Sequence, residues 1–70
     1  MELSARNQIK GTFKAIKTDQ IMAEVTISLP GGDTLVSVIT AESTRNLGLK
    51  QGTSVIVVTK STEVMLATED

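Results

Sequence analysis

The sequence has no cysteine and no histidine, and Phe13 is its only aromatic residue. Without cysteine or histidine there are no disulfides, no usual zinc site and no Ser-His-Asp triad. The apolar stretches are far shorter than the roughly 20 residues needed to cross a bilayer. The first residues also lack the basic and apolar regions of a signal peptide. These absences predict a cytoplasmic protein that is neither an enzyme nor a membrane protein, and we expect no residue to bind a metal cation directly.

The chain also has almost no excess of one charge over the other. Seven basic and eight acidic side chains give a formal net charge of −1. Nucleic acids and anionic membranes attract proteins with a positive excess, which this chain does not have. Single-stranded nucleic acids are further held by stacked aromatic side chains. We therefore expect no nucleic-acid partner.

The 70 residues are enough for one domain, which we place at residues 1–70 with a core over about 2–67 and a polar tail at 68–70. A domain this short buries a modest fraction of its surface, so its own core is marginal. With disulfides and zinc excluded, oligomerisation remains the best source of the missing stability.

Apolar residues alternate with polar ones over much of the chain, as in half-buried strands. From Ile9 to Ala15 the odd positions are apolar, and Gly11 among them indicates a bulge or a close backbone approach. The run from Ser54 to Thr59 is apolar on both faces and is expected to be covered on both. The sequence predicts five strands, at residues 9–15, 21–29, 34–39, 54–59 and 63–67.

Turn and cap residues divide these strands. Pro30-Gly31-Gly32-Asp33 predicts a hairpin between the second and third strands. Thr40 is a good N-cap for a short helix, and Gly48 is suited to end that helix after Leu47. The fold class is therefore all-β, a small five-stranded barrel with one short helix.

Two polar segments are rich in hydrogen-bond donors, namely Ser4-Ala5-Arg6-Asn7 and Lys60-Ser61-Thr62. Hydroxyl, guanidinium and ammonium groups suit an unprotonated oxyanion, which presents only acceptors. Each segment also has an ordinary explanation, as a solvated arm or as a charged strand end. Spacing alone does not bring the two segments together.

The segment Ser4-Ala5-Arg6-Asn7-Gln8-Ile9-Lys10-Gly11 resembles the signature that begins molbindin (Mop) domains, with isoleucine in place of the usual leucine at position 9. The similarity continues through Gly31-Gly32-Asp33 and Ser37-Val38-Ile39-Thr40. It closes with residues 47–52 and Lys60-Ser61-Thr62-Glu63-Val64-Met65, so that it covers about residues 2–67 in matching order.

The resemblance implies an OB-fold-like barrel whose strands are exchanged between subunits, assembled as a hexamer from three dimers. It also implies molybdate or tungstate as the ligand, bound at subunit interfaces for intracellular storage or homeostasis, with no organic cofactor. The oxyanion-binding residues implied by the motif are Ser4, Arg6, Ser43, Lys60 and Ser61, with Asn7 and Thr62 as supporting residues. Each assignment has an alternative. Ser43 could do no more than support its helix turn, and Arg6 and Lys60 could form salt bridges to Glu42 or Glu63 instead of binding a ligand.

Two other functions remain possible from the sequence. Residues 40–52 also resemble half of a swapped-hairpin DNA-binding domain of the AbrB type, although such domains usually have a proline before the helix and a basic face. Here the helix offers Arg45 against Glu42. The third possibility is a protein–protein interaction module that has kept the fold and lost the ligand. Such a module is expected to form an oligomer whose melting temperature does not respond to molybdate.

Overall fold

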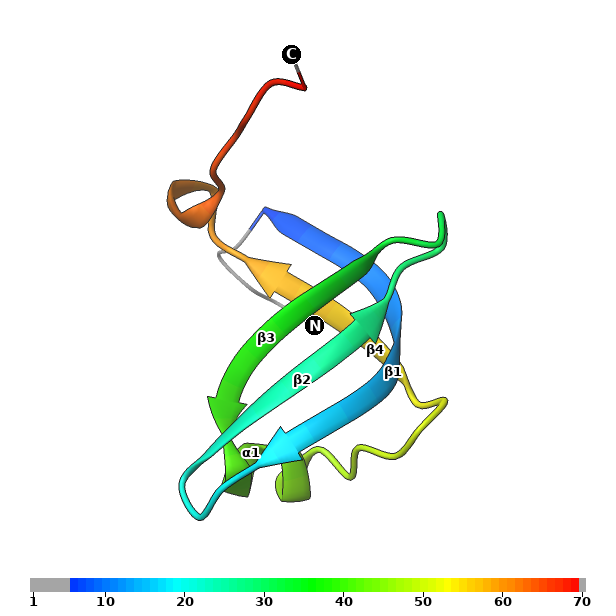
Figure 1. Ribbon diagram of the computed structural model, residues 1–70, viewed down its shortest axis with the longest axis vertical. Helices are drawn as coiled ribbons and strands as arrows, with labels where there is room; N and C mark the ends of the chain where they lie inside the picture. Colours follow the sequence, from blue (N-terminus) through cyan, green and yellow to red (C-terminus); the bar gives the residue numbers. More distant parts are fainter. Residues whose placement is uncertain (1–5, 70) are drawn as a thin grey trace.

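Four strands and one short helix form the body of the chain in a computed structural model, which describes residues 6–69 (Figure 1). A single turn of 3-10 helix, η1, follows the last strand. The elements are β1 (Asn7–Thr18), β2 (Met22–Ser28), β3 (Thr34–Thr40), α1 (Ala41–Asn46), β4 (Ser54–Thr59) and η1 (Ser61–Glu63). No helix in this part of the chain is both long enough and apolar enough to span a bilayer.

The four strands form one sheet in the order β3-β2-β1-β4, with every neighbouring pair antiparallel. The sheet curls into a half-barrel, and α1 lies beneath one end of it (Figure 1). β3 and β4 are the two edge strands, because each has one hydrogen-bonded neighbour in this sheet. The all-β class and the short helix are thus confirmed, and the barrel is open between β3 and β4.

Local hydrogen bonds hold the turns between the first three strands. Between β1 and β2, the Asp19 carboxylate accepts hydrogen bonds from the backbone N–H groups of Ile21 (2.8 Å) and Met22 (2.7 Å). These two bonds favour the charged form and lower the pKa of Asp19. Between β2 and β3, the Leu29 N–H donates to the Asp33 carbonyl at 2.8 Å, which closes the predicted hairpin.

Both predicted ends of the helix are confirmed. The Thr40 hydroxyl accepts a hydrogen bond from the Ser43 N–H at 3.1 Å, as an N-cap does. At the other end Leu47 is the C-cap, and Gly48 follows with a φ of 63°. A side chain at that φ is strained, so glycine is the suitable residue for leaving the helix there.

The core lies on one face of the paired strands β1 and β2. Its fully buried side chains are Phe13, Ala23, Val25 and Ile27. Gly11 lets β1 approach β2 closely: a Cβ at this position would lie 2.5 Å from Ile27 Cγ2 and 3.1 Å from the Ser28 carbonyl oxygen. The close approach predicted at Gly11 is therefore confirmed.

A β-bulge in β1 corrects the predicted alternation. We expected Ala15 to share a face with Phe13, but the register of β1 on β2 shifts between these two residues. Phe13 lies opposite Ile27, whereas Ile16 lies opposite the buried Val25. Lys14 is the extra residue, and after it the even positions face the core.

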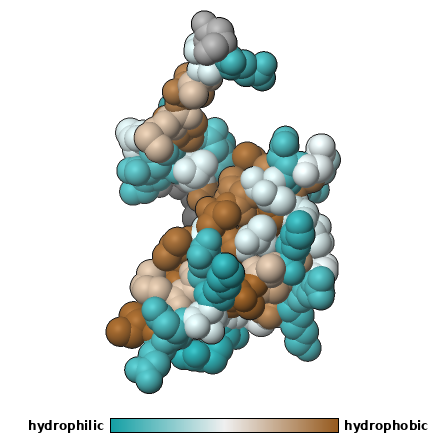
Figure 2. Space-filling view, in the orientation of Figure 1, coloured by the Kyte–Doolittle hydropathy of each residue, from teal (hydrophilic) through white to brown (hydrophobic). Residues whose placement is uncertain are grey.

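The predicted fifth strand at residues 63–67 is not present in the described chain. Glu63 ends η1, and residues 64–69 have no regular secondary structure. They project from the body as a separate arm (Figure 2). The coverage expected on both faces of β4 is also not achieved within one chain, because Ile56 and Val58 are 49% and 42% exposed. The free edges in the chain belong to β3 and β4, and the arm leads away from the sheet instead of pairing with either (Figure 1).

Candidate oxyanion-binding site

The pairing of β1 with β4 brings together the two donor-rich segments. Asn7, the first residue of β1, lies opposite Thr59, the last residue of β4. Arg6 and Lys60 are the next residues beyond this pair, so they leave the same end of the ladder (Figure 1). Both side chains are exposed. Two basic residues distant in sequence thus follow the same end of the β1–β4 ladder.

The turn after β4 presents further donors beside Lys60. Lys60 has an extended backbone, with φ −75° and ψ 144°, and its carbonyl accepts a hydrogen bond from the Glu63 N–H at 2.9 Å. This turn leaves the hydroxyls of Ser61 and Thr62 exposed. Across residues 6–69 neither Arg6 nor Lys60 forms an ion pair, so the expected alternative of a salt bridge to Glu42 or Glu63 is not observed there.

Ser43 is held at the start of α1 by Thr40. Their hydroxyl oxygens are 2.6 Å apart, and the Ser43 N–H also donates to the Thr40 oxygen. When the Thr40 hydroxyl donates to Ser43, the hydroxyl hydrogen of Ser43 remains free for a ligand. Ser43 therefore supports its helix turn, and it retains a donor for a ligand when Thr40 donates in the bond between their hydroxyls.

A single chain does not gather all the predicted residues. Ser43 lies with α1 at one end of the molecule, whereas Lys60 and Ser61 lie at the opposite end (Figure 1). Ser4 falls outside the described residues. The geometry of one chain thus joins Arg6 and Asn7 with Lys60, Ser61 and Thr62, and leaves Ser43 apart.

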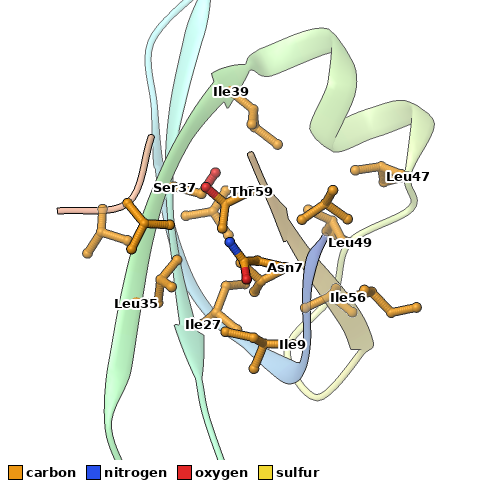
Figure 3. A pocket seen from close by; sticks show the side chains of 16 residues that line it. Asn7, Ile9, Ile27, Leu35, Ser37, Ile39, Leu47, Leu49, Ile56 and Thr59 are labelled. Atoms are coloured by element: carbon orange, nitrogen blue, oxygen red, sulfur yellow. The ribbon is translucent and has the colours of Figure 1, made fainter. Parts of the chain in front are cut away.

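An apolar trough of about 740 Å³ inside the half-barrel is a different feature. Isoleucine, leucine and valine side chains form most of its wall, and Asn7, Ser37 and Thr59 are the polar exceptions (Figure 3). No charged side chain lines it. The trough therefore suits apolar side chains rather than an oxyanion.

The sequence reasoning missed Thr59, which lies between the trough and Lys60. Its position opposite Asn7 gives it a place at the junction of the two donor segments. The alternation of β4 already put Thr59 on the same face as Val55 and Val57, and that signal is enough to find it.

Within residues 6–69 there is no cluster of three or more acidic, histidine or cysteine side chains that could hold a metal cation.

Comparison with known proteins agrees with this fold. The TOBE domain family matches residues 3–66. Molybdenum-pterin-binding protein 3 of Clostridium pasteurianum is 46% identical over 66 residues, which cover 94% of this chain and 97% of that protein. The chain therefore belongs to the molbindin family of TOBE-domain proteins.

Two solved structures have the same fold. A molybdate-binding protein from Sporomusa ovata superposes with a TM-score of 0.90 at 32% identity, covering 97% of this chain and all of that one. The cytoplasmic molybdate-binding protein ModG, crystallised with molybdate bound, superposes with a TM-score of 0.83 at 46% identity. That match covers 87% of this chain and 43% of ModG.

Proposed function

We propose that this protein binds molybdate or tungstate at sites formed between subunits, and that it serves as an intracellular store or buffer of the oxyanion. The observation that carries the proposal is the pairing of Asn7 with Thr59, after which the chain continues to Arg6 on one strand and to Lys60 on the other. Two neighbouring cations without an ion pair in residues 6–69 provide the charge that a dianion needs. The molybdate-binding relatives supply the chemical identity of that dianion.

The donor set favours a fully deprotonated oxyanion. Arg6 and Lys60 neutralise its charge, while the hydroxyls of Ser4, Ser43 and Ser61 orient its oxygens. Asn7 and Thr62 order the two segments. All of these groups can donate to an oxygen acceptor. Monohydrogen phosphate carries an O–H that needs an acceptor in return, so a wall made of donors disfavours it.

The distance between Ser43 and Lys60 in the chain supports a shared site. Ser43 of one subunit meets Lys60 of another in the assembly that we propose, a hexamer built from three strand-exchanged dimers. The arm of one subunit lies in the trough of its partner and adds the fifth strand between β3 and β4. Val64, Met65 and Leu66, which are 47%, 92% and 94% exposed in one chain, become buried there.

Binding rather than catalysis is the proposed role. The similar proteins are described by what they bind, and both the DNA-binding and the ligand-free alternatives lack such support. The site also offers no histidine or cysteine for acid–base or nucleophilic chemistry.

Calorimetric titration with molybdate tests the site. Arg6→Ala and Lys60→Ala each remove a charge-assisted contact worth about 1.5–3 kcal/mol, so each weakens binding by about tenfold or more. Lys14→Ala, which removes the same charge from the bulge of β1, is the matched control and should leave the affinity unchanged. Parent-like affinity in both site variants would show that the site lies elsewhere.

A further inference from the structure

A row of three hydroxyls crosses the outer face of the sheet, the face opposite the core. Thr12 of β1 lies opposite Ser28 of β2 on one side and Ser54 of β4 on the other. Residues directly opposite one another in neighbouring strands point to the same face, about 5 Å apart. The three side chains therefore form one line, which we call the hydroxyl row.

The hydroxyl row borders a hollow of about 540 Å³. Lys10 also lines this hollow, and Leu29, Pro30 and Ile56 form an apolar rim. No aspartate or glutamate is among the lining residues. A hollow with three hydroxyls, one ammonium group and no carboxylate suits an anion and repels a cation.

The donors of this hollow have no partners within the described chain. None of the three hydroxyls, and not the Lys10 ammonium, forms a hydrogen bond or ion pair with residues 6–69. Lys17 on the same strand differs, because it lies opposite Glu24. Lys10 lies opposite Ile56, so its charge has no acidic neighbour directly across the strand. Ordinary β propensity accounts for the hydroxyl residues, and Lys10 adds the positive charge among the residues that line the hollow.

We propose that the hydroxyl row and Lys10 form a second oxyanion site, separate from the one at Arg6 and Lys60. Its ligand is a small inorganic tetrahedral oxyanion, for which sulfate and molybdate are both suitable probes. Thr12 and Lys10 are exposed and Ser28 is half-buried, so water screens the site. Weak binding and poor discrimination between sulfate and molybdate follow. This inference goes beyond the proposed function and stands without it.

Titration of the isotope-labelled, full-length protein followed by amide NMR tests the second site. Sodium sulfate and sodium molybdate should each shift the amides of residues 10–12, 28 and 54–56, with similar midpoints. The double variant Lys10→Gln/Thr12→Val should raise that midpoint by at least about tenfold. Lys14→Gln removes a charge from the same strand outside the hollow and should not change it.

Each outcome separates the two sites. Shifts at residues 60–63 without shifts along the hydroxyl row would overturn this inference and leave the proposed function standing. Shifts along the row without any at residues 60–63 would support the second site and contradict the first. If Lys14→Gln and Lys10→Gln/Thr12→Val lose the same amount of binding, the anion is attracted by the overall charge of the strand and not by the hydroxyl row. That result would overturn the inference.

Discussion

The β1–β2 hairpin and the segment from β4 to residue 69 differ in how much of their apolar surface one chain covers. In the hairpin, Phe13, Val25 and Ile27 are each at most 4% exposed. In the later segment Ile56, Val58 and Leu66 are 49%, 42% and 94% exposed. The hairpin has both of its neighbours in the chain, β3 beside β2 and β4 beside β1. β4 and the arm have free edges.

The difference teaches that the buried core belongs to the first part, the hairpin, whereas no described residue of the second part, from β4 onward, is buried within one chain. A short domain gains little from its own core, so a covered interface adds the stability that it lacks. The predicted oxyanion residues follow the same division. Arg6 and Lys60 follow the same end of the β1–β4 ladder, whereas Ser43 lies in α1 at the opposite end and, in the site that we propose, meets them from a second chain.

Removal of the arm should break the assembly and leave the hairpin region folded. Deleting residues 64–70 removes three apolar side chains whose full burial stabilises by about 1.5–3 kcal/mol each. We expect the dissociation constant of the assembly to rise by about a thousandfold or more. Native mass spectrometry measures the change, and deletion of residues 68–70 alone is the control. An unchanged oligomer would contradict the division between the two parts.

Molybdate should stabilise the assembled second part. At a free concentration 100 times Kd, binding to the folded state alone adds about 2.7 kcal/mol, which raises Tm by several degrees. Thermal unfolding followed by circular dichroism measures the shift. Lys60→Ala should lose most of it, and phosphate, which carries an O–H at neutral pH, should produce little of it. If Lys60→Ala shows the same rise in Tm as the parent, the stabilisation by molybdate does not come from the proposed site.

Gly11→Ala should damage the first part instead. The new Cβ would meet Ile27 Cγ2 and the Ser28 backbone oxygen, so strands or side chains must move. We expect a loss of about 1–3 kcal/mol in the free energy of unfolding, measured by urea denaturation. Gly31→Ala is the matched control, because its Cβ would lie 4.0 Å from Asp33 Oδ2, its nearest neighbour. Equal losses in both variants would mean that the close approach at Gly11 does not matter.

The smallest effect is expected at Asp19, in the turn of the hairpin. Its two backbone hydrogen bonds lower its folded-state pKa, so it binds protons less readily when folded than when unfolded. Its contribution is therefore present above the ordinary aspartate pKa and is lost as pH falls through the lowered value. Asp19→Asn should flatten the dependence of Tm on pH below about pH 4. An unchanged pH profile would remove Asp19 as a source of that dependence.

The first part of the fold was the easier one to predict from sequence. Its hairpins and helix ends depend on local chemistry, such as the Thr40 cap and the Gly48 turn, which the residues themselves carry. The bulge at Lys14 was missed because an extra residue in a strand leaves no mark on composition. The prediction of a fifth strand was wrong for one chain, because residues 63–67 find no strand partner within residues 6–69.

The candidate site depended more on resemblance than on physical reasoning. The residues alone identified two segments rich in donors, but the register that sets Asn7 opposite Thr59 arises from pairing across almost the whole chain. Ser43 was proposed from the family motif. Its hydrogen bond to Thr40 became visible only with the coordinates. Thr59 was missed although the alternation of its strand already indicated its face.

Complementation between two variants tests the shared site most directly. Ser43→Ala and Lys60→Ala are each titrated with molybdate alone, and then after the two proteins are unfolded and refolded together. If Ser43 and Lys60 act from different subunits, the mixed assembly contains some sites with both residues intact. We predict that parent-like affinity returns in a fraction of the sites. A mixture that binds only as the sum of the two separate variants would contradict a site shared between subunits.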